Sequence, residues 1–123
     1  MGKYVIKKTS NDGFVFNLIA SNNQVIGTSQ TYKSLASAKA GIESVKKNAG
    51  SDIEDQTVKD FEVKKNPKFE VFLDKADEYR FRLKASNGEI ILTSQAYKAK
   101  TSAKNGIESI QNNADSEIVD ETK

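Results

Sequence analysis

The stretch SNGEIILTSQAYKAKTSAKNGIES, residues 86–109, sets the architecture of the chain, because residues 21–44 hold a close copy of it, SNNQVIGTSQTYKSLASAKAGIES. Matching residues keep a constant offset, as Tyr32 and Tyr97 show (97 − 32 = 65). Roughly half of the aligned residues agree without a gap, which is typical of one supersecondary unit used twice. A chain of 123 residues can bury one core, whereas one repeat alone would be marginal, so we expect the two repeats to share a core.

Each repeat reads as three strands, a helix and a fourth strand. In the first repeat, β-forming runs between turn signals predict strands at residues 4–8, 14–20 and 24–29. An apolar stripe spaced 3, 4, 3 and 4 then predicts a helix, capped by Ser34 and closed by left-handed residues at 48–50. Residues 52–57 are expected to be extended. The second repeat follows the same order, with a helix that starts later, capped by Thr101.

The expected organisation is one domain, 1–123, in which repeat one covers 3–57 and repeat two covers 68–123. The linker between them, 58–67, contains Pro67, the only proline, which cannot donate to a sheet ladder. Residues 61–65 within it are nevertheless predicted to be a strand. Gly41 and Gly106 fall in the middle of the two helices, where glycine costs about 1 kcal/mol relative to alanine. We therefore predict a close approach of each helix to its neighbour.

The composition excludes several kinds of chemistry. The chain has no Cys and no His, which removes disulfides, thiolate and imidazole catalysis and the commonest transition-metal ligands. Its 19 basic and 17 acidic side chains give a net charge of +2 and are mixed along the sequence, unlike those of a strongly basic nucleic-acid protein. No window is long and apolar enough for a membrane span. We expect a soluble cytoplasmic protein with no cofactor.

Residues 69–114, FEVFLDKADEYRFRLKASNGEIILTSQAYKAKTSAKNGIESIQNNA, resemble the YegP-like family of small bacterial proteins, UPF0339 or DUF1508. The first copy resembles it with departures: Asn23 replaces a glycine, and Val15 and Ile19 stand where the second copy has Arg80 and Lys84. The resemblance implies an α+β fold of tandem β-β-β-α-β repeats in a single antiparallel sheet, with both helices on one face and the C-terminal strands exchanged between repeats. It brings no catalytic residue. A monomer with internal pseudo-twofold symmetry is expected.

The outer face of the sheet, away from the helices, is the first candidate binding site. If Phe81 and Leu83 face the helices, the alternate residues of that strand point outward. This places three cations around the Phe72 ring of a flanking strand, with Ile91 of another flanking strand beside them. Phosphates bind such cations and bases stack on such rings, so this face could hold single-stranded nucleic acid. The simpler interpretation is a solvated face on which Glu70 and Glu89 pair with the cations of neighbouring strands. The candidate face consists of Phe72, Arg80, Arg82 and Lys84.

The second candidate is a polar cluster where strand gives way to helix, in the repeated pattern Ser-Gln-x-Tyr-Lys. Such a junction can bind an anion, and a tyrosine with a lysine can form an acid–base pair. The structural alternative is a tyrosine ring packed under the helix with its hydroxyl satisfied. The cluster consists of Ser29, Tyr32, Lys33, Ser94, Tyr97 and Lys98.

For function, the sequence favours a non-catalytic interaction or accessory module of unknown partner. Single-stranded nucleic-acid binding through the outer face is the alternative. An enzyme ranks third, because it would need a deep pocket that brings Tyr32 or Tyr97 together with a lysine.

Overall fold

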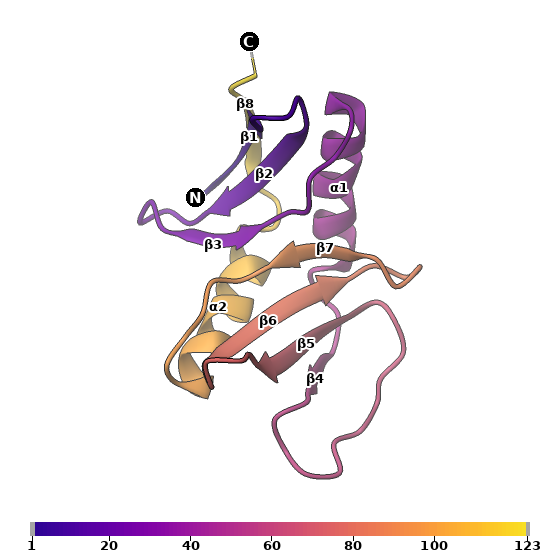
Figure 1. The fold of residues 1–123 in the computed structure, drawn as a ribbon, viewed down its shortest axis with the longest axis vertical. Coiled ribbons are helices and arrows are strands. Elements are labelled where there is room, and N and C mark those ends of the chain that lie inside the picture. Colours follow the sequence, from indigo (N-terminus) through magenta and orange to yellow (C-terminus); the bar gives the residue numbers. More distant parts are fainter. Residues whose placement is uncertain (1, 123) are drawn as a thin grey trace.

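The structure is a computed structural model that describes residues 2–122, and it contains the predicted repeat as two units with the same order of elements (Figure 1). Repeat one consists of β1 (Lys3–Lys8), β2 (Phe14–Ile19), β3 (Val25–Thr28), α1 (Leu35–Asn48) and β4 (Ile53–Asp55). Repeat two consists of β5 (Lys68–Leu73), β6 (Tyr79–Lys84), β7 (Ile90–Thr93), α2 (Lys100–Asn113) and β8 (Glu117–Asp120).

Tight turns join the first three strands of each repeat. Asp12 and Asn23 adopt φ of 64° and 68° in repeat one, and Asp77 and Gly88 adopt 60° and 84° in repeat two. Asn, Asp and Gly tolerate this left-handed geometry, which lets two neighbouring strands turn back on each other. The three strands therefore form an antiparallel meander in each repeat.

The eight strands form a single sheet in the order β4-β5-β6-β7-β3-β2-β1-β8. The predicted exchange is confirmed, because β4 of repeat one pairs with β5 and β8 of repeat two pairs with β1. The sheet is mixed rather than wholly antiparallel, since these two outermost pairs are parallel. Each exchanged strand follows a helix, which carries it to the outer edge of the other repeat.

Both helices cover the same face of the sheet and close one shared core. Rings on neighbouring strands meet edge to face, with centroids 5.9 Å apart for Tyr4–Phe16 and 6.2 Å for Phe69–Phe81. The core residues form one continuous cluster drawn from both repeats, which agrees with the expectation that the repeats share an interior. The largest fully buried apolar side chains are Tyr4, Ile6, Phe16, Leu18, Ile42, Phe69, Phe81, Leu83, Leu92, Ile107 and Ile110.

The helix ends correct two predictions. α2 begins at Lys100, at the position equivalent to the start of α1, although Ala99 offers no side-chain cap and Ser34 does. The sheet fixes this start, because Tyr32 and Tyr97 exchange two backbone hydrogen bonds with Phe14 and Tyr79 just before each helix. No left-handed residue closes the helices. Instead Ser51 and Ser116 each donate a hydroxyl hydrogen bond of 2.6 Å to the carbonyl oxygen three residues earlier.

The linker also differs from its prediction. Residues 61–65 form no strand. The backbone N–H of Lys64 donates to the Glu54 carboxylate at 2.7 Å, rather than to a neighbouring strand. Phe61 and Val63 are 36% and 73% exposed, so this segment lies beside the outer strand β4 without joining the ladder of the sheet.

The two helical glycines mark close approaches to aromatic rings, as predicted. A Cβ at Gly41 would lie 2.7 Å from Tyr32 Cζ, and one at Gly106 would lie 2.8 Å from the hydroxyl of Tyr97. The tyrosine rings in turn stack on Phe16 and Phe81 at 6.1 and 6.4 Å between centroids. Each glycine therefore lets its helix rest on an aromatic stack.

Gly106→Leu is expected to lower the free energy of unfolding by about 2–3 kcal/mol, because the added side chain has to displace Tyr97 and Phe81. Urea unfolding of the purified variant measures this change. Gly50→Leu is the control, since nothing lies within 4 Å of a Cβ at that position, and it should change stability by less than about 0.5 kcal/mol. An unchanged melting temperature for Gly106→Leu would contradict the packing explanation.

Candidate functional site

The outer face of repeat two carries a network of paired charges across three neighbouring strands. Lys68 Nζ lies 2.8 Å from Glu54 Oε1 and 3.4 Å from Glu70 Oε2. Glu70 also pairs with Arg82 and with Lys84. Because Glu54 and Glu70 are only 2% and 3% exposed, these ion pairs are shielded from water and are stronger than surface pairs. We call Glu54, Lys68, Glu70, Arg82 and Lys84 the ion network.

Gln56, which follows β4, and the linker complete this ion network. Lys68 Nζ donates to the carbonyl oxygen of Lys64 at 3.0 Å, and Gln56 Nε2 donates to Glu54 Oε2 at 2.6 Å. Burial opposes ionisation of Glu54, but the hydrogen bonds from Gln56, Lys68 and the backbone of Lys64 outweigh it and lower the pKa of Glu54 to about 2. Glu54 is therefore a fixed anion at neutral pH.

The structure brings the four residues of the first candidate site together but pairs their charges. Arg82 lies over the Phe72 ring with 4.5 Å between the guanidinium carbon and the ring centroid. Arg82 and Lys84 both pair with Glu70, and Arg80 Nε donates to Asp74 Oδ2 at 2.8 Å. At Arg82 and Lys84 phosphates would have to compete with Glu70, and bases would find the Phe72 face occupied by Arg82.

Two neighbours expected on this face lie elsewhere. A register shift between Leu83 and Lys84 turns Ile91 inward, where it is 3% exposed and lines a cleft beside α1. Glu89 lines the same cleft, so it does not pair with the cations of the outer face, whereas Glu70 does, through Arg82 and Lys84.

The second candidate cluster is divided between two faces of the molecule. The Ser29 and Ser94 hydroxyls each accept a backbone N–H at 2.9 Å, from Phe16 and Phe81, and donate to the next carbonyl at 2.7 Å. Tyr32 and Tyr97 pack under the helices, and burial raises the pKa of Tyr32. Lys33 and Lys98 are exposed, and within residues 2–122 neither lysine side chain forms a hydrogen bond with a tyrosine hydroxyl. The cluster therefore forms no tyrosine–lysine pair.

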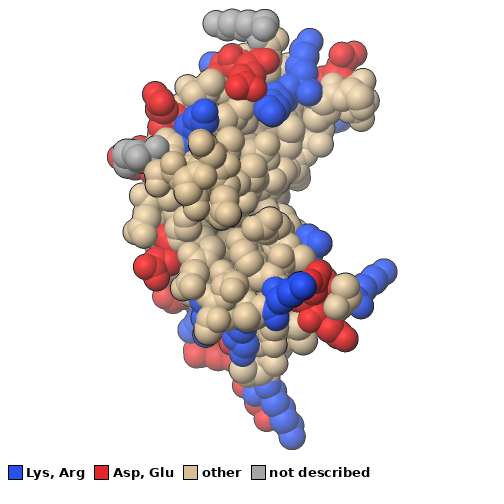
Figure 2. All heavy atoms as spheres, turned by 90° about the vertical axis from the view of Figure 1, so that its left-hand side faces the viewer, with Lys and Arg blue, Asp and Glu red and all other residues tan. Residues whose placement is uncertain are grey.

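The two repeats meet at a seam where β3 and β7 share a single pair, Thr28 with Thr93. A groove of about 580 Å³ lies along this seam. Figure 2 shows the molecule hollowed at mid-height on one side, and the seam lies at the same height in Figure 1, which shares its vertical axis. We call it the seam groove; it is lined by Val25, Gly27, Thr28, Ser29, Gln30, Arg80, Ile90, Thr93, Ser94 and Gln95.

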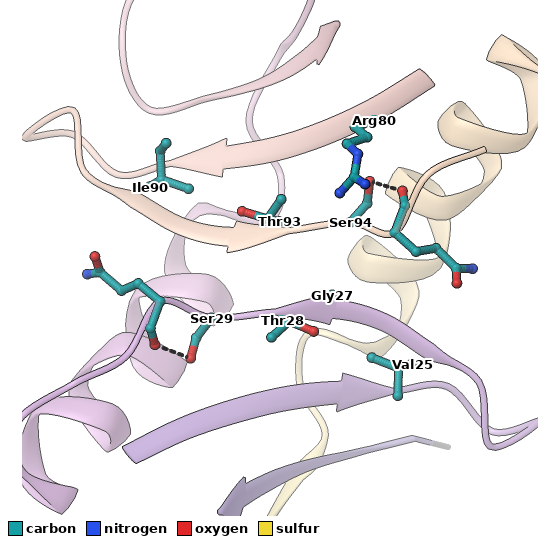
Figure 3. Close-up of a pocket in the computed structure, with 10 residues that line it drawn as sticks. Val25, Gly27, Thr28, Ser29, Arg80, Ile90, Thr93 and Ser94 are labelled. Atoms are coloured by element: carbon teal, nitrogen blue, oxygen red, sulfur yellow. Dashed lines mark hydrogen bonds between the residues drawn. The ribbon is translucent and has the colours of Figure 1, made fainter. Parts of the chain in front are cut away.

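The lining of the seam groove repeats across the pseudo-twofold axis (Figure 3). The threonines and the hydrogen-bonded Ser29 and Ser94 occur as pairs at the offset of 65, and so do the glutamines that follow each serine. Val25 and Ile90 stand at opposite ends and are 41% and 36% exposed. The groove thus offers polar groups along its length and an apolar side chain at each end.

Sequence reasoning singled out the two serines and Arg80 but missed the rest of this groove. The threonines, the glutamines and the exposed Val25 and Ile90 are visible as matched positions in the two copies. Nothing in either copy indicates that β3 and β7, which lie far apart along the chain, become neighbours. Only that pairing turns two ordinary strand ends into one groove.

Two further properties concern the described part of the chain. Residues 2–122 hold no group of three carboxylates placed to bind a metal ion together. Across the same residues, neither helix has the length and apolar character needed to cross a bilayer.

Comparison with known proteins gives consistent matches over nearly the full length. The family model described as "Domain of unknown function (DUF1508)" matches residues 10–55 and 74–121. A UPF0339 protein of Mannheimia succiniciproducens is 40% identical over 119 residues, which are 97% of this chain and 93% of that protein. A UPF0339 protein of Agrobacterium fabrum is 61% identical over 56 residues, which are 45% of this chain and 90% of that protein. The solution NMR structure of yegP from E. coli superposes with a TM-score of 0.81 at 31% identity, covering 98% of this chain and 93% of that one.

Proposed function

The chain belongs to the YegP-like DUF1508 (UPF0339) family, and from this premise we propose that it is a non-catalytic interaction module that holds an extended segment of a partner protein in the seam groove. The observation that carries the proposal is the groove itself, with its paired polar lining and an apolar residue at each end. An extended peptide presents backbone N–H and C=O groups about every 3.3 Å. Threonine and glutamine side chains can both donate to and accept from such a backbone.

The lining favours binding over catalysis. Its one ionisable side chain is Arg80, and a guanidinium stays protonated in proteins, so it cannot exchange a proton as a general acid or base. The hydroxyls of Ser29 and Ser94 are each engaged as donor and acceptor by the backbone. A serine in this state lacks the adjacent base that would activate it as a nucleophile.

The lining also favours a peptide over nucleic acid. It contains no aromatic side chain on which a base could stack, and Arg82 and Lys84 of the neighbouring outer face are both paired with Glu70. Salt-dependent binding of single-stranded oligonucleotides that falls in Arg82→Glu would support nucleic-acid binding instead.

The test is a selection from a random peptide library displayed on phage, followed by ¹⁵N NMR mapping of the recovered peptides. We expect the peptides to shift the resonances of Thr28 and Thr93. Thr93→Trp, which fills the groove, should weaken their binding at least about tenfold, a loss of about 1.4 kcal/mol. Thr101→Trp, on an exposed position of α2, is the control and should leave affinity unchanged. Peptides that bind Thr93→Trp as well as the wild type would refute the proposal.

A further inference from the structure

The seam groove is nearly symmetric, and Arg80 is the side chain that breaks the symmetry. Its counterpart in repeat one is Val15 (80 − 65 = 15), which does not line the groove. The residues that stabilise the β1–β2 turn and the β5–β6 turn also differ between the repeats. Thr9 accepts the backbone N–H of Gly13, and its counterpart Asp74 accepts that of Glu78. Thr9 has a single side-chain oxygen, whereas Asp74 has two. The second oxygen of Asp74 accepts a hydrogen bond from Arg80 Nε at 2.8 Å.

Asp74 holds Arg80 in position through one of its donors, Nε. Hydrogen bonds from Arg80 and from the backbone N–H of Glu78 and Ala76 keep the pKa of Asp74 below its usual range, so this carboxylate is a fixed anchor. The hydrogen bond from Arg80 to Asp74 uses the Nε donor. A guanidinium has five N–H donors in a planar fork, so this bond engages one of the five. Figure 3 shows this guanidinium beside Ser94, at one end of the groove. The lining itself contains no carboxylate.

We propose that Arg80 makes the seam groove directional and selects polypeptide segments with a carboxylate at one end. This inference rests on the proposed peptide-binding function. A twofold lining alone would accept a peptide in either of two opposite orientations, because the polar pairs and the apolar ends look alike from both. A single guanidinium favours the orientation that brings an Asp or Glu side chain, or a C-terminal carboxylate, to the end of the groove beside Ser94. Planar, charge-assisted hydrogen bonds to a carboxylate suit arginine in particular.

The test uses peptides recovered from the random library. The recovered sequences should be enriched in Asp or Glu near one end. Replacing that residue by its amide, or Arg80 by Val, should weaken binding about tenfold, and Arg80→Lys should restore part of the loss. Lys39→Gln is the matched control, because it removes one positive charge at an exposed position of α1, away from the groove.

Orientation is read separately, with a nitroxide attached to one end of the peptide. In the wild type it should broaden resonances at one end of the groove, either that of Val25 and Ser94 or that of Ser29 and Ile90, whereas in Arg80→Val, which imitates Val15, it should broaden both ends. Peptides that occupy the groove without acidic enrichment, and that bind Arg80→Val unchanged, would overturn this inference and leave the proposed function standing. A library that yields no peptide in the groove would overturn both. The spectrum of Arg80→Val without peptide shows whether the variant is folded.

Discussion

Residues 58–123, produced without the first repeat, are expected to form a homodimer rather than a folded monomer. In the intact chain, β5 takes β4 as its outer neighbour and β7 takes β3, and both partners come from repeat one. A chain of this size buries too little surface to be stable with both edges open. Two copies restore the arrangement, because β8 of each can occupy the place of β4 on the β5 of the other. Sedimentation equilibrium and circular dichroism over a range of concentrations measure association and folding together.

The ion network identifies the weak point of that dimer. Val119 would stand where Glu54 stands (119 − 54 = 65), so Lys68 would lose one of its two carboxylate partners. Val119→Glu in the fragment is therefore expected to tighten dimerisation by about tenfold or more, since a buried charge is stabilised when its partner returns. Thr122→Glu adds the same charge outside the network and should have little effect. A folded monomer at micromolar concentration would contradict the shared-core explanation.

The relative from Agrobacterium fabrum fits this expectation. The matched region spans 90% of that protein but only 45% of this chain, so that protein is about one repeat long. One repeat of this fold leaves β5 or its equivalent without an outer neighbour, and a second copy is the direct way to supply one.

Glu54→Ala is expected to lower the free energy of unfolding of the full chain by about 3–5 kcal/mol, because it leaves Lys68 buried without its nearest anion. Urea denaturation at neutral pH measures the change. Glu43→Ala is the matched control. Glu43 is 67% exposed and lies 3.8 Å from Lys46, and such a surface pair contributes less than about 1 kcal/mol. Equal effects of the two substitutions would show that the ion network adds nothing beyond surface charge.

A double replacement tests whether the cost comes from the orphaned charge. Glu54→Leu combined with Lys68→Met removes both members of the pair and should recover most of the stability lost in Glu54→Ala, because apolar replacements of a buried pair are often neutral. A double variant as unstable as the single one would point to lost packing instead.

The Glu54–Lys68 pair makes the free energy of unfolding depend on pH. The folded pKa of Glu54 is about 2, below its ordinary value of 4.5. A depressed carboxyl pKa stabilises the fold fully above the unfolded value, and the contribution disappears as the pH falls through the folded value. The wild type should therefore lose stability more steeply than Glu54→Gln between about pH 4.5 and pH 2.

Much of the fold was predictable because repetition and local patterns agree. Alternation in β2 and β6, the Asn87–Gly88 turn and the stripe on α1 each indicate an element, and the offset of 65 doubles every observation. The errors arose where tertiary contacts override local preference. α2 starts without a capping side chain because the sheet holds Tyr97. Residues 61–65 look like a strand but give the N–H of Lys64 to a carboxylate.

The candidate sites were harder to predict because they depend on register and on pairing between distant segments. A shift of one residue between Leu83 and Lys84 was enough to turn Ile91 into the core. The alternation correctly placed Arg80, Arg82 and Lys84 outward, but no pattern in the sequence shows that Glu70 would be buried among them. The seam groove requires β3 and β7 to meet, and each strand carries only half of it.

The position of β1 between β2 and β8 bears on how the protein is made. Lys3 pairs with Glu117, so the first strand to leave the ribosome waits for the last one before both its edges are covered. During synthesis, β1 and β2 can form their hairpin, but the free edge of β1 stays open to other chains until β8 emerges. The sheet is thus completed only once β8 has been made, and the time for which the edge of β1 stays open is set by the number of residues between the two strands.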